Sequence, residues 1–181
     1  MKRQKIVMNG KEMARTLERL AFEVLERYGE CQGLAMLGVQ RRGAELAERL
    51  KKLLEPRLGC ELPLGKLDIN LYRDDWTHLE HQPRINQTDI PFAIDGRRVL
   101  LVDDVLFSGR TVRAALEAIL DYGRPKSVEL LVLVDRGHRE LPIQADYVGK
   151  LIPTSKVERV DVYVKEIDGE DKVRLADEDH S

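Results

Sequence analysis

The stretch VLLVDDVLFSGRT, residues Val99–Thr111, joins a strand-like segment to a helix-like one. Four apolar residues, typical of a buried strand, lead directly into the adjacent carboxylates of Asp103 and Asp104, and a Ser-Gly turn follows before helix-like sequence. In an open α/β sheet, ligands bind at the carboxyl ends of the strands, where loops meet helix N-termini. Such a terminus offers backbone N–H groups to an anion. The segment therefore predicts carboxylates for hydroxyls or Mg²⁺ beside a phosphate site, which suits a phosphorylated sugar.

A purely structural role for the two aspartates is the alternative. One aspartate after a strand is readily explained as the cap of a turn. Two in succession, between an apolar run and a turn that can bind phosphate, favour a ligand site instead. The turn is not a Walker phosphate loop, because the sequence lacks the G-x-x-x-x-G-K-[ST] pattern.

Strand-like and helix-like segments alternate on both sides of this stretch. Asn9 predicts a helix N-cap, with Glu12 as its capping-box partner. The periodicity then predicts helices over 10–28, 40–56 (ending at Pro56) and 109–123, and strands over 33–39, 61–71, 97–102, 127–135 and 157–167. This alternation is typical of an α/β fold with a mainly parallel, doubly wound sheet.

The 181 residues are expected to form a single domain, residues 1–181. Residues 72–91 are polar and poorly periodic, so a hairpin or mobile loop is expected there, and a second irregular excursion is expected after Asp135. The acidic tail, residues 168–181, is expected to be solvated or frayed.

Composition and charge exclude several classes of protein. Hydrophobic residues make up 43% of the chain, and no apolar run approaches the roughly 20 residues that span a bilayer, so a soluble cytoplasmic protein with no membrane partner is expected. The net charge of −2 gives no overall attraction to nucleic acid, although a local basic face is compatible with it. Cys31 and Cys60 lack metal-ligand spacing, and two reduced thiols are favoured over a disulfide.

The motif at Val99–Thr111 closely resembles the phosphoribosyl-pyrophosphate (PRPP) motif of type I phosphoribosyltransferases. The segments LYRDD (Leu71–Asp75), VDRGHRELPI (Val134–Ile143) and ADYVGKLIPTS (Ala145–Ser155) resemble the PyrR family within that class. The resemblance covers nearly the whole chain except the acidic tail. It implies the type I phosphoribosyltransferase fold, a mainly parallel doubly wound sheet with a flexible hairpin loop and a small hood.

The resemblance also implies a reaction, in which uracil and PRPP give UMP and pyrophosphate with Mg²⁺. Asp103 and Asp104 would be catalytic and would face the ribose hydroxyls, directly or through Mg²⁺ and water. The 5′-phosphate would be held by the segment that follows, namely Val105, Leu106, Phe107, Ser108, Gly109, Arg110 and Thr111.

A second loop, GVQRRG (Gly38–Gly43), resembles the pyrophosphate loop of the family. Its binding residues would be Gln40, Arg41, Arg42 and Gly43. Arg42 matches the family's arginine, whereas Gln40 and Arg41 stand where members vary or carry a lysine and a threonine. By composition alone, an Arg-Arg pair more often marks a solvated helix start. Arg73, in the loop that would close over the substrate, is a further catalytic candidate and pyrophosphate contact.

Base recognition would involve Asp135 and Arg136, at the end of a predicted strand. A purine-specific relative would be expected to present a lysine there, so uracil is favoured over hypoxanthine. His138 could serve as a general base, but uracil N1 is acidic enough to react without one. A structural or binding role for His138 is therefore favoured.

The PyrR family also binds an RNA hairpin in pyrimidine-operon leaders, through a basic dimer surface. Basic positions of RNA-binding members are matched by Arg19, Arg27, Arg139 and Lys150. Glu18, Phe22 and Gln144 depart from the family's threonine, histidine and arginine. Because fewer cations and an added carboxylate weaken phosphate binding, attenuation is predicted to be weakened or absent. The family also implies a homodimer or higher homo-oligomer.

Three functions follow in order of preference. The first is a uracil phosphoribosyltransferase in which the PRPP motif is intact. The second is an attenuator that binds pyrimidine-operon mRNA and has a secondary transferase activity. The third is a transferase for another base, such as hypoxanthine or orotate.

Overall fold

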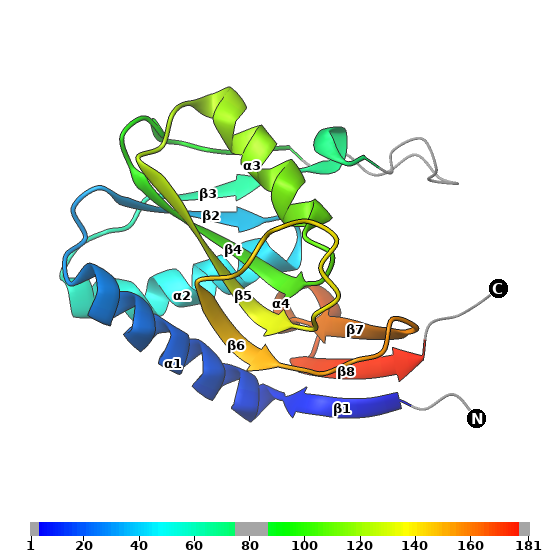
Figure 1. Ribbon diagram of the computed structural model, residues 1–181. Coiled ribbons are helices and arrows are strands. Elements are labelled where there is room, and N and C mark those ends of the chain that lie inside the picture. The colour runs from blue at the N-terminus through cyan, green and yellow to red at the C-terminus, as the bar shows by residue number, and fades with distance from the viewer. Residues whose placement is uncertain (1–3, 75–86, 178–181) are drawn as a thin grey trace.

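The computed structural model describes residues 4–74 and 87–177. Its centre is a five-stranded parallel sheet in the order β3-β2-β4-β5-β6 (Figure 1). The strands are β2 (Leu34–Val39), β3 (Leu64–Leu67), β4 (Arg98–Leu106), β5 (Ser127–Asp135) and β6 (Tyr147–Leu151). In the register, Leu101 of β4 lies opposite Leu37 on one side and Leu130 on the other. The predicted parallel α/β sheet is confirmed.

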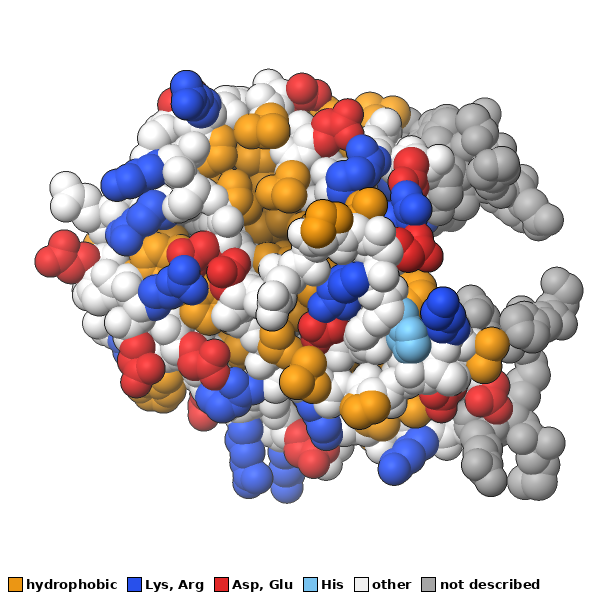
Figure 2. Space-filling model, viewed as in Figure 1, with side chains coloured by type: hydrophobic (Ala, Val, Ile, Leu, Met, Phe, Trp, Pro, Cys, Tyr) orange, Lys and Arg blue, Asp and Glu red, His pale blue; other side chains and the backbone are white. Residues whose placement is uncertain are grey.

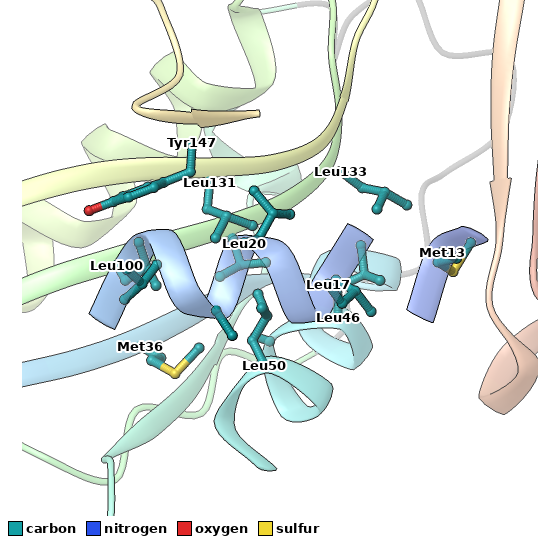
Figure 3. Close-up of a cluster of buried hydrophobic side chains, with 14 of the residues drawn as sticks. Met13, Leu17, Leu20, Met36, Leu46, Leu50, Leu100, Leu131, Leu133 and Tyr147 are labelled. Atoms are coloured by element: carbon teal, nitrogen blue, oxygen red, sulfur yellow. The ribbon is translucent and has the colours of Figure 1, made fainter. Parts of the chain in front are cut away.

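Helices cover both faces of this sheet, as a doubly wound fold requires. Helices α1 (Gly10–Tyr28) and α2 (Arg42–Leu58) pack on one face, and α3 (Arg110–Tyr122) packs on the other. Figure 3 shows the first core, where Leu17 and Leu20 of α1 meet Leu46 and Leu50 of α2 over Leu131 of β5. The second core joins the other face of the sheet to the buried side of α3, namely Val112, Ala114, Ala115, Ala118 and Ile119.

Helix α1 begins where the sequence predicts. The Glu12 N–H donates to Asn9 Oδ1 at 3.0 Å, and the Asn9 N–H donates to the Glu12 carboxylate at 2.7 Å, which completes the capping box. The predicted end of α2 at Pro56 is wrong. Proline removes one backbone donor and leaves later donors in place, and the helix continues to Leu58. It ends at Gly59, whose φ of 66° is left-handed.

A second sheet forms a hood over the carboxyl ends of the central strands. It consists of β1 (Gln4–Asn9), β8 (Lys172–Asp177) and β7 (Glu158–Tyr163), in that antiparallel order. The expectation of a solvated tail over 168–181 is therefore wrong for its described part. Strand β8 is the central strand of the hood because β1 and β7 satisfy its backbone on both sides, and its Val173 is buried.

Two further segments differ from the expectations. The excursion after Asp135 contains β6, which pairs with β5, and the strand expected over 61–71 divides into β3 and a 3-10 turn at Asn70–Tyr72. The loop expected over 72–91 falls mostly outside the described residues. At its end, Asp89 forms an antiparallel bridge with Lys66, through N–H···O bonds of 2.7 and 2.8 Å.

Cys31 and Cys60 form a disulfide with Cα atoms 6.6 Å apart, so the favoured expectation of two reduced thiols is wrong in this structure. The two cysteines shortly precede β2 and β3, which are parallel neighbours. Their starting ends therefore meet at the same edge of the sheet. Among the described residues, no helix is both long enough and apolar enough to cross a membrane.

Candidate active site

The two aspartates lie inside β4, not after it. The strand was expected to end near Val102, but it continues to Leu106, because β5 pairs with it as far as Asp135. Backbone bonds are thus satisfied while two carboxylates are carried to the end of a central strand. Asp103 is buried, with 5% of its surface exposed, and Asp104 is half-buried.

The electrostatics of this pair are unfavourable without a ligand. Burial raises the pKa of the Asp103 carboxyl well above its usual range, and the neighbouring charge of Asp104 raises it further. Burial also raises the pKa of Asp104, although a hydrogen bond with Asp103 and the charge of Arg42 act in the opposite direction. Two such groups favour a cation or hydroxyl donors at this position.

Two glycines bring the predicted pyrophosphate loop against this strand. A Cβ on Gly43 would lie 2.7 Å from the Val102 carbonyl oxygen, and one on Gly38 would lie 2.4 Å from Ala44 Cα. Neither position has room for a side chain, so the first turn of α2 packs directly on β2 and β4. The peptide bond between Gln40 and Arg41 is cis.

The predicted residues converge on one cavity of about 230 Å³. Its wall includes the aspartate pair, Arg73, three of the four pyrophosphate-loop candidates and the two ends of the predicted phosphate segment, namely Gln40, Arg41, Arg42, Arg73, Asp103, Asp104, Val105 and Thr111. Gly43 and residues 106–110 do not line it. Val39, Ile69 and Asn70 also line it and were not predicted from the sequence. Asn70 follows β3, and a polar residue at the end of a third parallel strand is the signal that could have identified it.

The predicted phosphate turn leads into the N-terminus of α3. Gly109 has a left-handed φ of 91°, which glycine adopts readily. The turn is braced from behind, since the N–H groups of Glu140 and Leu141 donate to the Ser108 carbonyl at 2.9 and 3.1 Å. The Arg110 guanidinium pairs with Glu140 at 2.7 Å and with Asp74, and Arg110 does not line the cavity.

Arg42 joins the cavity to the segment between β7 and β8, which belongs to the hood. Its guanidinium donates from Nε and Nη2 to the two carboxylate oxygens of Asp168, at 3.1 and 2.7 Å. Asp168 ends the short helix α4 (Lys165–Asp168), within the segment that was expected to be a solvated tail. Arg42 also lines a second cavity, of about 190 Å³, together with Asp104 and residues 159–163 of β7.

The predicted base-binding residues lie at the end of β5 and line a cavity of about 380 Å³ with Leu151, Ile152 and Pro153. Asp135 accepts from the Gly137 N–H at 3.0 Å and pairs with Arg139. Arg136 is buried, donates to the Ser155 carbonyl at 3.1 Å and stacks over the Phe107 ring at 4.0 Å.

Nearby, the His138 imidazole is 2.6 Å from the Thr154 carbonyl oxygen, which ties it to the same loop. The backbone of His138 has a φ of 64°, unusual for a residue with a side chain. These contacts are compatible with the structural or binding role favoured for His138.

The predicted RNA contacts divide between two places. Arg19, Arg27 and Lys150 lie on α1 and β6 and are exposed, whereas Arg139 is half-buried and donates to carbonyl oxygens of Phe107 and Ile143. Arg27 pairs with Glu129 at 3.2 Å and Asp146 at 3.7 Å. On the face shown in Figure 2, basic side chains are interspersed with acidic ones and do not form one continuous patch.

Arg19 and Lys150 also have partners at the edge of the central sheet. The Arg19 side chain pairs with Glu23 and donates to the carbonyls of Val148 and Gly149, while Lys150 Nζ donates to the Val7 carbonyl at 2.7 Å. The three positions that depart from the family, Glu18, Phe22 and Gln144, are all exposed. The Arg57 guanidinium lies over the Phe22 ring at 4.8 Å.

The donor set at the end of β4 suits magnesium. In the described part of the chain, no three His, Cys, Asp or Glu side chains gather into a protein-built metal cage. Magnesium usually binds through one or two carboxylates, retains waters and takes its other ligands from substrate phosphates. Asp103 and Asp104, adjacent and lining a cavity with three arginines, fit that mode of binding.

Structural comparison shows where this fold occurs elsewhere. A hypoxanthine phosphoribosyltransferase of Trypanosoma cruzi superposes with a TM-score of 0.72 at 19% identity, covering 97% of each chain. One from Staphylococcus aureus gives 0.70 at 21% identity, covering 93% of this chain and 90% of the other. At this identity, the similarity shows the phosphoribosyltransferase fold alone.

Sequence comparison is more specific. The chain is 52% identical over 169 residues to the bifunctional protein PyrR of Thermus thermophilus, covering 93% of each chain. It is 55% identical over 159 residues to that of Pelotomaculum thermopropionicum, covering 88% of each. Residues 3–167 match the phosphoribosyl transferase domain. With both matches extending over most of its length, the chain belongs to the PyrR family of type I phosphoribosyltransferases.

Proposed function

We propose that this phosphoribosyltransferase transfers the phosphoribosyl group of PRPP to uracil, which forms UMP and pyrophosphate. The observation that carries the proposal is the convergence of the aspartate pair, the pyrophosphate loop and the start of the phosphate turn's helix on one cavity. The relatives are named bifunctional, in agreement with an enzyme that has a second role.

The geometry suggests a division of labour around the sugar. Asp103 and Asp104 face the ribose hydroxyls, and their charge stabilises the oxocarbenium character that develops at the anomeric carbon. The α3 N-terminus and the turn at Ser108–Thr111 hold the 5′-phosphate, and the cationic loop with Arg41 and Arg42 holds the departing pyrophosphate. Mg²⁺, held by Asp103 and Asp104 through water, would neutralise charge on the pyrophosphate.

Arg73 lines the same cavity as Arg41 and Arg42. It directly follows the 3-10 turn at Asn70–Tyr72 and lies near the end of the first described range, residues 4–74. We assign it to the pyrophosphate, because a third guanidinium in this cavity adds positive charge where negative charge accumulates as the leaving group departs.

Uracil is the proposed base because the end of β5 carries Asp135, where a purine-specific enzyme would present a cation. The cavity beside Asp135 and Arg136 has an apolar floor of Leu151, Ile152 and Pro153, as a flat base requires. The backbone that follows β6 would read the polar edge of the base.

The test is UMP formation from uracil and PRPP with Mg²⁺, run beside hypoxanthine and orotate. Uracil-selective turnover is expected. Equal or greater turnover with hypoxanthine or orotate would replace uracil with another base. Absence of turnover with all three would contradict the transferase proposal and favour a nucleotide-sensing regulator.

We also propose that RNA attenuation is weakened in this chain. The supporting observation is charge compensation: Arg27 faces Glu129 and Asp146, Arg19 faces Glu23, and Glu18 adds an exposed carboxylate to the same helix. Each cation that no longer binds an RNA phosphate lowers the salt dependence of RNA affinity by about one unit.

Binding of a pyrimidine-operon leader hairpin at physiological salt tests this second proposal. The wild-type chain is expected to bind weakly, and a variant with E18T, F22H and Q144R is expected to bind more tightly. Tight, sequence-specific binding by the wild type would contradict it. The same samples, examined by light scattering, test the proposed homodimer or higher homo-oligomer.

A further inference from the structure

Two arginines of α2 bind carboxylates in the segment between β7 and β8, and so connect the hood to a helix that packs on the central sheet. We call these two contacts the hood clamps. Arg42, in the first turn, binds Asp168 through two hydrogen bonds. Arg49, two turns later, binds Glu166 at 2.9 Å and Asp171 at 3.1 Å. Both contacts join α2 to the segment between β7 and β8, but the two arginines have different surroundings. Arg42 lines the cavity beside Asp104, whereas Arg49 reaches Met13 Sδ at 3.7 Å.

The pair between Arg42 and Asp168 restrains the guanidinium in one orientation. Asp168 occupies the edge formed by Nε and Nη2, so the plane of the group is set and the N–H groups of Nη1 remain for another acceptor. Asp168 is itself held, because its Oδ2 also accepts from the Val164 N–H at 2.8 Å. Its side chain is only 13% exposed, so water competes little for the pair.

Arg42 lies on the wall of two cavities, one facing the pyrophosphate loop and the other facing β7. A free arginine at this position could turn toward either one, and ordering its long side chain costs entropy when a ligand binds. A carboxylate that already holds the group reduces this cost, and preorganisation of this kind increases affinity.

We propose that Asp168 is a positioning residue that orients Arg42 to bind the pyrophosphate group of PRPP. The inference rests on the proposed function, because it takes Arg42 as a pyrophosphate ligand. It assigns a role in the site to a hood residue, 126 positions further along the chain, that does not itself line the described cavities. The Arg42 hydrogen bonds also lower the pKa of Asp168, so the carboxylate is charged at neutral pH.

The test compares two ligands that differ in pyrophosphate. Dissociation constants for PRPP with Mg²⁺ and for UMP are measured by calorimetry on the wild type and on Asp168→Asn. The variant keeps the size of the side chain and removes its charge. PRPP affinity is expected to fall about tenfold, while UMP affinity changes less than about twofold, because UMP carries the 5′-phosphate without pyrophosphate. Asp168→Glu is expected to recover most of the loss.

Glu166→Gln is the matched control. This change weakens the contact of Arg49 with α4 and leaves the contact between Arg42 and Asp168 in place. Its PRPP affinity is expected to equal that of the wild type. In an Arg42→Gln background, Asp168→Asn is expected to have no further effect, because the residue acts through Arg42. Thermal unfolding of every variant is recorded alongside.

Three results would overturn the inference. Unchanged or tighter PRPP binding by Asp168→Asn would show that the carboxylate does not assist Arg42. Parallel losses for PRPP and UMP, shared by Glu166→Gln, would show that the hood clamp supports the fold in general. A persistent effect in the Arg42→Gln background would separate Asp168 from Arg42. If the wild type itself fails to bind PRPP, the proposed function has failed and the inference fails with it.

Discussion

The carboxylates at the end of β4 and those in the hood differ in what balances their charge. In the hood, Asp168 and Glu166 each face an arginine, whose hydrogen bonds lower the pKa of the carboxyl group. In β4, Asp103 and Asp104 are adjacent to each other in a buried strand, and burial raises the pKa of both. The two acidic groups lie on either side of Arg42, which pairs with Asp168 and acts on Asp104 by its charge.

This difference separates carboxylates that an arginine of the protein already neutralises from carboxylates that a ligand can neutralise. A carboxylate that is paired with an arginine, such as Asp168 or Glu166, gains little from binding a ligand itself, although it can hold its arginine in position for one. A buried pair without full compensation gains when a cation or a set of hydroxyls arrives, so it favours the bound state. The fold therefore keeps unfavourable charge at the proposed substrate site and neutralises it in the hood.

The largest expected effect is on catalysis. Asp104→Asn removes one charge from the pair and is expected to reduce uracil transfer by about 10²- to 10³-fold, the usual cost of losing one group that stabilises the transition state. The melting temperature should remain close to that of the wild type. Initial rates and thermal unfolding measure the two quantities. Equal losses of activity and fold would return Asp104 to a purely structural role.

A second change tests how closely α2 must approach β4. Gly43→Ala places a Cβ within 3 Å of the Val102 carbonyl, so α2 must move away from β4. The free energy of unfolding is expected to fall by about 1–3 kcal/mol, the usual cost of overpacking. Denaturant titration measures it. Gly59→Ala, at a position with open space but a left-handed φ, is the control for backbone conformation alone.

A third change is expected to stabilise the protein, whereas most substitutions of a buried residue destabilise it. Asp103→Asn is expected to stabilise the ligand-free protein by about 1 kcal/mol at neutral pH, a typical size for a single substitution, because it removes a poorly compensated buried charge. It should also abolish the gain from Mg²⁺ and PRPP. Thermal unfolding with and without these ligands is the measurement, and destabilisation of the ligand-free variant would contradict the charge argument.

The smallest expected effect is on the pH dependence of stability. The pKa of Asp103 is higher in the folded protein than in the unfolded chain, so the folded state binds more protons and the site's contribution to stability falls as pH rises through that window. The lowered pKa values of Asp168 and Glu166 act oppositely, and their contribution is lost as pH falls below about 4. Asp103→Asn should flatten the first dependence and Asp168→Asn the second, as measured by unfolding at several pH values.

The sequence by itself identified those features whose residues lie close together along the chain. The capping box at Asn9 and Glu12 marks the start of α1 because both partners lie within four residues. The aspartate pair and the turn at Gly109 are likewise contiguous, and so they indicate a site for a phosphorylated sugar without any knowledge of the fold.

The contacts between distant segments depend on how the chain packs, which no short stretch of sequence specifies. The sequence of β8 has only a weak strand pattern. The segment forms a strand because β7 pairs with it on one side and β1, from the other end of the chain, pairs with it on the other. The disulfide and the pair between Arg42 and Asp168 depend on the same packing. A charged residue such as Asp168 is equally compatible with solvent and with a buried ion pair, and its partner is chosen by the fold, which brings α2 beneath the hood.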